Sequence, residues 1–260
     1  MDFRNLFMAL GVLIAMPLNV FAQVSNTDSL NSTTERAVEN YNFNWRQTIL
    51  PASLITAGAV AIAPGFLRHG NHGLTNAIID LRGNHRRLEF DDYVQYLPVV
   101  GAWTLGCVGA KAKHTFVERT LIVATSYASL GVLTNVPKYF VDEKRPEFAG
   151  HNSFPSGHTA TVFMGAELVR IEYGGWYGIG AYTVAVGVGF MRMYNGRHWF
   201  NDVVAGAGIG ILSARIGEWS ACLWQKLLKK KGRKEQNFAL TPIATPFSGG
   251  YYGFSMGCCF

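Results

Sequence analysis

The sequence predicts an all-α protein, a membrane-associated helical bundle of about six core helices. Hydrophobic residues make up 49% of the 260 residues and charged residues 15%, whereas about a quarter of an average soluble domain is charged. Apolar segments of helix length follow one another with short polar stretches between them. The chain is long enough to bury one full core, and we find no internal repeat and no second domain.

Residues 1–22 have the pattern of a secretory signal peptide. A basic residue precedes the apolar run 6–18, and small side chains mark a cleavage point after Ala22. An uncleaved anchor helix is the alternative, but the run is short and Pro17 interrupts it. Residues 23–46 are rich in Ser, Thr and Asn and are expected to form a flexible exported lead-in.

Six apolar segments are expected to form the core helices, and they are residues 48–67, 93–110, 120–137, 158–176, 174–191 and 203–224. The first, second, third and fifth carry no charged side chain and are about long enough to span a bilayer core. The other two contain opposite charges three residues apart, a spacing that favours ion pairs on one helix face. These pairs are expected to face the bundle interior, or to lie on helices that are only partly immersed; they are Glu167 with Arg170 and Arg215 with Glu218.

The helical domain is expected to span residues 47–225, and a basic flank and tail to follow over 226–260. The basic run at 229–234 adjoins an apolar segment, a position typical of a cytoplasmic membrane flank. The other basic residues are scattered, so the net charge of +6 does not indicate a nucleic-acid partner. Residues 238–260 place Pro and Gly between short aromatic stretches, which favours either a small C-terminal hairpin or a loosely ordered tail.

Two cations follow the third apolar segment. Lys138 and Arg145 are seven residues apart, so both point the same way if the segment is helical. Pro146 then disfavours a continuing helix. Taken alone, such a pair is typical of interfacial side chains whose charged ends reach water.

A second polar stretch opens the next apolar helix with Ser156, Gly157 and His158. Free backbone amides and the positive end of the helix dipole make such a start an anion site, and the histidine would lie beside the anion. The simpler interpretation is an ordinary N-cap, with Ser156 satisfying the first turn.

The third stretch joins the fifth and sixth apolar segments and contains Arg192, His198 and Asp202. His198 and Asp202 are four residues apart, so one helical turn lets the carboxylate reach the imidazole. A carboxylate on one ring nitrogen fixes the tautomer and leaves the other nitrogen as a nucleophile. A structural hydrogen bond is the alternative for an isolated His–Asp pair.

All three stretches lie at ends of apolar segments that a bundle would bring to one rim. Together they supply three cations, a helix N-terminus and two histidines, which suits phosphoryl transfer because that reaction requires positioning and charge stabilisation above all.

These residues resemble the motifs of the type 2 phosphatidic acid phosphatase superfamily. The first motif, a lysine followed after six residues by Arg-Pro, is matched by Lys138, Arg145 and Pro146. The second, Pro-Ser-Gly-His, is matched at 155–158. The third, Ser-Arg with a histidine and an aspartate further on, is matched at Arg192, His198 and Asp202, but its serine is Met191 here, which removes one phosphate hydrogen bond.

The resemblance implies a helical phosphatase that needs no metal and no cofactor. Its catalytic residues would be His198, the nucleophile that forms a phosphohistidine, Asp202, which orients it, and His158, the general acid. Its phosphate-binding residues would be Lys138, Arg145, Ser156, Gly157 and Arg192.

The resemblance also implies a phosphorylated membrane lipid as partner, with lipid A and undecaprenyl pyrophosphate as the leading substrates for an envelope protein. Three alternatives are a soluble periplasmic acid phosphatase of the same superfamily, a lipid phosphotransferase and a non-catalytic lipid-binding bundle. A vanadate-dependent haloperoxidase would share the anion pocket, but this chain is small and apolar for that role.

Residues 68–92, with Arg82, Arg86 and Arg87, are interpreted as a solvated connecting loop, or as a head-group site if they face the same rim.

The expected location is the bacterial inner membrane, with the site facing the periplasm. The basic run at 229–234 places the end of the last helix in the cytoplasm. Six full spans would then leave residues 23–46 in the cytoplasm as well, whereas a signal peptide would export them. Segment 48–67 contains Pro51 and Pro64 and is the one expected not to span.

Overall fold

A computed structural model describes residues 44–235 and consists of helices joined by loops. Its elements are α3 (Arg46–Val60), α4 (Phe66–Arg82), α5 (Asp91–Val94), α6 (Leu97–Thr104), the 3-10 turn η1 (Leu105–Val108), α7 (Phe116–Phe140), α8 (Gly157–Tyr173), α9 (Gly175–Tyr194) and α10 (Phe200–Glu235). In this part of the chain the β-pairing consists of one isolated bridge, between Glu143 and Asn152. The predicted all-α class is therefore confirmed. The predicted signal peptide, most of the lead-in and the C-terminal hairpin lie outside the described residues.

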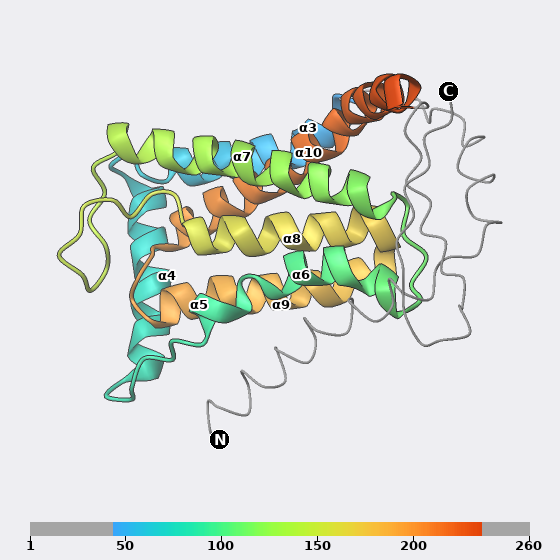
Figure 1. Cartoon of the computed structure of the whole chain (residues 1–260). Helices are drawn as coiled ribbons and strands as arrows, with labels where there is room; N and C mark the ends of the chain where they lie inside the picture. The colour runs from blue at the N-terminus through green and yellow to red at the C-terminus, as the bar shows by residue number, and fades with distance from the viewer. Residues whose placement is uncertain (1–43, 236–260) are drawn as a thin grey trace.

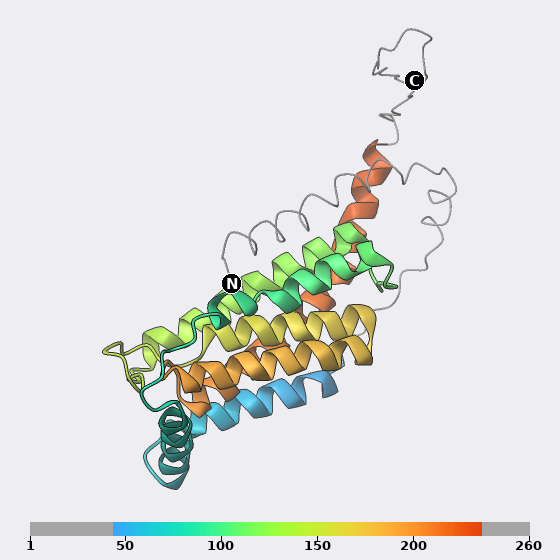
Figure 2. The ribbon, with the colours of Figure 1, turned by 90° about the horizontal axis from the view of Figure 1, so that it is seen from below.

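The core is a bundle in which α3, α6, α7, α8, α9 and α10 run alongside one another, while α4 lies across one end (Figure 1). Helix α8 packs against α6, α9 and α10, and α10 packs against α3, α7 and α8. The view from below shows the same long helices side by side, with α4 seen almost along its axis (Figure 2). This arrangement confirms the predicted six core helices.

Helices α8 and α10 approach closely because glycines line α10 where it meets its neighbours. A Cβ atom on Gly206 would lie 2.6 Å from the carbonyl oxygen of Ser156, and one on Gly210 would lie 2.8 Å from the amide nitrogen of Met164. Small residues four apart are a common means of bringing helix backbones together in membrane proteins. The start of α8 is therefore held against the first turns of α10.

The charged side chains of α8 and α10 form a buried network, as the sequence predicts. Glu167 accepts from Arg170 at 2.7 Å, and Arg215 donates to Glu218 at 2.7 Å. Arg215 also reaches across to Glu167 at 2.6 Å, so the network ties the two central helices together. Glu167, Arg215 and Glu218 are buried, so the expectation that these charges face the bundle interior is confirmed.

The predicted boundary between the apolar segment 48–67 and the loop 68–92 is wrong, because two helices, α3 and α4, occupy these residues up to Arg82. Helix α3 ends at Val60, and Gly65, with a φ of 142°, separates it from α4. Helix α4 then takes up the first half of the supposed loop. Its apolar face, which includes Leu74 and Ile78, follows helical spacing between polar residues, so it lacks the unbroken apolar run by which core segments were recognised.

The predicted segment 93–110 is also interrupted. It divides into α5, α6 and η1, and it ends at Gly109, whose φ of 96° suits glycine. Among residues 44–235, α7 is the helix that is long and apolar enough to cross a membrane, judged by length and composition. Segments 48–67, 93–110 and 174–191 were also predicted to be about long enough to span a bilayer. Within residues 44–235, none of them forms a helix that meets this criterion of length and composition.

The glycine contacts of α10 predict a difference between two alanine substitutions. Gly210→Ala should lower the free energy of unfolding by about 1–3 kcal/mol, because its Cβ would press on the backbone of α8. Gly187→Ala on α9 meets nothing within 4 Å and should be neutral or stabilising by about 0.5–1 kcal/mol. Thermal unfolding of the detergent-solubilised variants measures both. Equal melting temperatures for the two variants would contradict the close approach of α8 and α10.

Candidate active site

The three predicted motifs meet at one end of the bundle, where α7 and α9 end and α8 and α10 begin (Figure 1). The amide of Ser156 donates to the backbone oxygen of Asp202 at 3.1 Å, which joins the second motif to the third. Of the first motif, Lys138 lies in the last turn of α7 and Arg145 in the loop 141–156. The structure thus brings the predicted site residues around one point, whereas their chemical roles stay predictions.

His198 and Asp202 form a buried pair at the centre of this site. Nδ1 of His198 lies 3.3 Å from Oδ2 of Asp202. The same carboxylate oxygen accepts from the hydroxyl of Ser153 at 2.5 Å and from the amide of Trp199 at 3.0 Å. Helix α10 begins only at Phe200, so Asp202 lies in its first turn, where the helix dipole favours a negative charge. With Nδ1 directed at the carboxylate, Nε2 is the nitrogen available for attack.

Three cations surround His198 and keep it neutral. Burial lowers the pKa of His198 well below its usual range, and the charges of Arg192, Arg145 and Lys138 lower it further. Arg145 is similarly affected, since burial and the charges of Arg192 and Arg197 lower its pKa. A neutral imidazole beside a concentration of positive charge suits a nucleophile that attacks an anion.

Arg145 reaches the site through a loop, and the predicted helical spacing from Lys138 is wrong. Helix α7 ends at Phe140, one turn short of the arginine, because the chain turns to an extended conformation at Val141. The loop is closed by hydrogen bonds from the amide of Arg145 to the oxygen of Gly150, at 3.1 Å, and from Ser153 to Glu143, at 3.0 Å. Hydrogen bonds within this loop, and not two helical turns, therefore position Arg145.

The start of α8 shows Ser156 as its N-cap. The hydroxyl oxygen of Ser156 lies 3.5 Å from the amide of Thr159 and 2.9 Å from its hydroxyl, and Ser156 is fully buried. The simpler of the two sequence interpretations thus describes this side chain, and its contact with phosphate stays a prediction. Gly157 is the first helical residue, where the backbone amide has no helical acceptor.

Two aspartates that the sequence analysis missed contact the predicted site residues. Nη1 of Arg192 donates to Asp91 at 2.7 Å and to Asp92 at 3.0 Å. Nε2 of His158 lies 2.8 Å from Asp92. The available signal was two adjacent carboxylates just ahead of an apolar segment, but nothing local links them to residues so far along the chain.

A third missed carboxyl, Glu143, neighbours Asp202 of the His–Asp pair. Glu143 is buried, and its oxygens accept from the side-chain amide of Asn201 at 3.1 and 3.4 Å. Burial, and then the neighbouring charge of Asp202, raise the pKa of Glu143 to about 8. Glu143 and Asp202 therefore share one proton at neutral pH, which avoids two adjacent buried negative charges.

Arg82, the last residue of α4, and Arg87, in the loop that follows, hold the loop 141–156 in place. Arg82 donates to Glu147 at 2.6 Å and to the backbone oxygen of Tyr194 at 3.0 Å, and Arg87 donates to Glu147 at 3.0 Å. Arg86 is exposed. The predicted solvated loop is therefore wrong for Arg82, which is buried at the end of a helix and paired with Glu147, and a head-group contact of these arginines stays a prediction.

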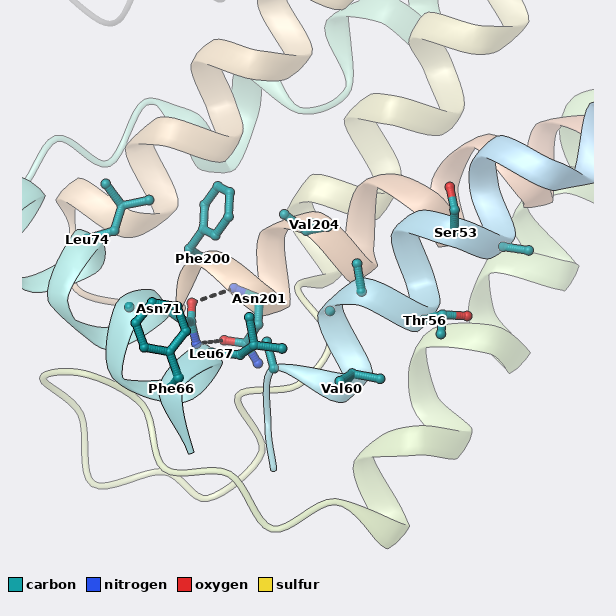
Figure 3. A pocket seen from close by; sticks show the side chains of 15 residues that line it. Ser53, Thr56, Val60, Phe66, Leu67, Asn71, Leu74, Phe200, Asn201 and Val204 are labelled. Atoms are coloured by element: carbon teal, nitrogen blue, oxygen red, sulfur yellow. Dashed lines mark hydrogen bonds between the residues drawn. The ribbon is translucent and has the colours of Figure 1, made fainter. Parts of the chain in front are cut away.

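An open apolar cavity of about 790 Å³ lies between α3, α4 and α10 (Figure 3). Phe66, Leu74 and Phe200 are among its lining residues. At its polar edge, Asn71 and Asn201 exchange hydrogen bonds of 2.6 and 2.8 Å, drawn in Figure 3. Because Asn201 also donates to Glu143, the polar edge of this cavity lies next to the buried carboxyl that neighbours Asp202.

Comparison with known proteins links the chain to lipid phosphatases. The model of the PAP2 superfamily matches residues 119–225. The lipid A 1-phosphatase of Porphyromonas gingivalis is 37% identical over 135 residues, which cover 50% of this chain and 30% of that protein. The undecaprenyl-diphosphatase of Sulfolobus acidocaldarius is 35% identical over 84 residues, which cover 31% of this chain and 39% of that protein. The chain thus spans less than half the length of each of these relatives.

A solved structure shares the fold. It is that of a transmembrane PAP2-type phosphatidylglycerolphosphate phosphatase from Bacillus subtilis, which matches with a TM-score of 0.50 and 22% identity. The match covers 73% of this chain and 99% of that one. It supports the helical bundle described above.

The raised pKa of Glu143 predicts a pH-dependent stability. Between the unfolded value of 4.5 and the folded value of about 8, the folded state binds more protons at this site than the unfolded state. Stability from this group is therefore complete below pH 4.5 and is lost as the pH rises through 8. Glu143→Gln should flatten the decline of the melting temperature between about pH 4.5 and pH 8.

Glu147→Gln is the matched control for this measurement. Hydrogen bonds from Arg82, the largest cause, and from Arg87 lower the pKa of Glu147, so this group titrates below that window. Its substitution should lower the melting temperature while leaving the slope with pH unchanged. A Glu143→Gln variant with the wild-type slope would show that Glu143 is already ionised at neutral pH.

Proposed function

We propose that this chain, whose residues 119–225 match the PAP2 superfamily, is a member of that superfamily and hydrolyses a phosphate monoester or pyrophosphate on a membrane lipid through a phosphohistidine at His198. One observation carries the proposal. Lys138, Arg145 and Arg192 place their charges around a neutral, buried His198 whose Nδ1 faces Asp202. Such a site binds a phosphoryl group and presents a nitrogen lone pair to its phosphorus atom.

The reaction proceeds in two balanced steps. Nε2 of His198 attacks phosphorus, the bond from phosphorus to the lipid oxygen breaks, and that oxygen takes a proton from His158. Water then attacks the phosphohistidine and gives a proton to His158, and inorganic phosphate leaves as the bond to Nε2 breaks. The three cations stabilise the charge on the phosphoryl oxygens in both steps. Met191 offers no hydrogen bond where the family has a serine, so phosphate contact rests on the cations and on the first amides of α8.

A lipid substrate agrees with the outer surface of the bundle. Large apolar side chains are exposed along it, among them Phe66, Val132, Trp176 and Ile179. Many exposed apolar side chains favour contact with a membrane, and α7 has the length and composition of a membrane span. The two relatives act, by their names, on lipid A and on undecaprenyl diphosphate, and these are the substrates we propose to test first.

We propose the bacterial inner membrane as the location, with the site facing the periplasm. Helix α10 begins at the site and ends at the opposite end of the bundle (Figure 1), where the sequence carries the basic run 229–234. Basic residues favour the cytoplasmic side. The site would then lie on the far side, where exported lipids present their phosphates.

A phosphate-release panel separates the proposed function from its alternatives. Lipid A and undecaprenyl pyrophosphate should release phosphate, and glycerophospholipid phosphates provide the comparison. Equal turnover of small soluble phosphate esters would favour the acid-phosphatase alternative. Labelled phosphate appearing in an acceptor lipid would favour a phosphotransferase, and binding without release on any substrate would favour a lipid-binding bundle.

His198→Ala should abolish phosphate release, by about 10³-fold or more, because the nucleophile is lost. Its melting temperature should stay near that of the wild type. His151→Ala removes an exposed histidine from the same end of the molecule and should keep full turnover. Substantial turnover by His198→Ala would end the assignment of the nucleophile.

The orientation can be measured with single cysteines in a background where the native cysteines are replaced. Asp142→Cys lies in the exposed loop beside the site, and Lys111→Cys lies in the exposed loop before α7, at the other end of the bundle. In intact spheroplasts a membrane-impermeant maleimide should label the first and spare the second. The reverse pattern would place the site in the cytoplasm.

A further inference from the structure

Asp92 is a half-exposed carboxylate that meets two of the predicted site residues. Its Oδ1 lies 2.8 Å from Nε2 of His158 and 3.0 Å from Nη1 of Arg192. It comes from α5, which no family motif includes, and no role was predicted for it. We propose that Asp92 is a positioning residue for the general acid, holding the ring of His158 by its Nε2 proton and stabilising its protonated form. This inference rests on the proposed function.

Arg192 does not depend on Asp92 for a counter-ion, because the neighbouring Asp91 already provides one. Asp91 is 1% exposed and already holds Nη1 of Arg192 at 2.7 Å, so this arginine has a permanent buried counter-ion. Asn195 fixes the other oxygen of Asp91 at 3.3 Å. Asp92, by contrast, has 41% of its side chain exposed and is the carboxylate within hydrogen-bond distance of His158.

The charges that face His158 oppose one another. Burial, and then the charge of Arg192 from α9, lower the pKa of His158 below its usual range, whereas Asp92 and Asp91 from α5 act against this lowering and favour the protonated ring. His198, from the loop before α10, is neutral and adds no charge. Without Asp92, the balance at His158 would move toward the neutral imidazole, which has no proton to spare for a leaving oxygen.

Each of the two histidines is paired with a carboxylate, but the proposed protonation of the two rings differs. At His198 a carboxylate orients a neutral ring that attacks. At His158 a carboxylate accepts one of the two N–H bonds of an imidazolium, and the second proton, on Nδ1, is available to the lipid oxygen. In the second step water returns that proton to the same nitrogen.

Asp92→Asn tests this inference, because it keeps the shape of the side chain and removes its charge. The pKa of His158, followed by NMR of the imidazole carbon in detergent and assigned with His158→Gln, should fall by about 1. The alkaline limb of the pH profile of kcat/KM should move to lower pH by the same amount. Above that limb, kcat/KM should fall by about tenfold.

Asp142→Asn is the matched control, since Asp142 also pairs with a histidine, at 2.8 Å, but on the exposed loop. It should change neither the pKa of His158 nor the pH profile. Asp92→Glu should restore part of the wild-type pKa. Asp92→Ser serves for the same measurements if Asp92→Asn does not fold.

An unchanged pKa of His158 in Asp92→Asn would overturn the inference, as would a loss of turnover with an unmoved alkaline limb, which a merely structural role would produce. The NMR measurement needs no substrate. A wild-type protein that releases phosphate from no lipid would therefore contradict the proposed function, while the pairing of Asp92 with His158 would still be decided by the titration.

Discussion

The close packing of α8 on α10 is the contact on which the site depends. Gly206 leaves room for the backbone oxygen of Ser156, and the amide of Ser156 in turn donates to the oxygen of Asp202. The first turn of α8, which carries His158, is thus fixed against the turn of α10 that orients His198. A larger residue at 206 would separate the two histidines, although it touches neither. Bundle packing and catalytic geometry are therefore parts of one structure.

Charge balance is the second requirement. Several cations around a buried imidazole would be costly to hold together without anions nearby. Asp91 provides a buried counter-ion for Arg192, and Glu143 shares a proton with Asp202. The site therefore combines a positive face, suited to a phosphoryl group, with carboxyls behind and beside it that hold the cations and rings in place. Substrate phosphate would supply the missing negative charge.

The polar end of the bundle and its apolar sides have different roles. At one end, the polar loops and α5 contact the residues of the proposed site. Along the sides, apolar residues such as Val132 and Trp176 face outward, and the buried network around Glu167 ties the central helices together without exposing charge. A lipid could lie against this surface while its phosphate reaches the polar end, which is how the fold suits a substrate with both parts.

Local patterns were enough to predict the helical class, the buried pairs of α8 and α10, and the residues that gather at the site. Spacing reports contacts between near neighbours in the chain, so the contact of His198 with Asp202, four residues apart, was predicted from the sequence, although His198 lies just before the first residue of α10. Helix α4 and the path of Arg145 were not, because a turn at Gly65 and a loop closed by backbone hydrogen bonds have no periodic pattern. The contacts of Asp92 were also hidden, since it meets Arg192 across one hundred residues. Such contacts exist only once the helices have packed, because no local spacing determines which distant side chains then share the same few ångströms.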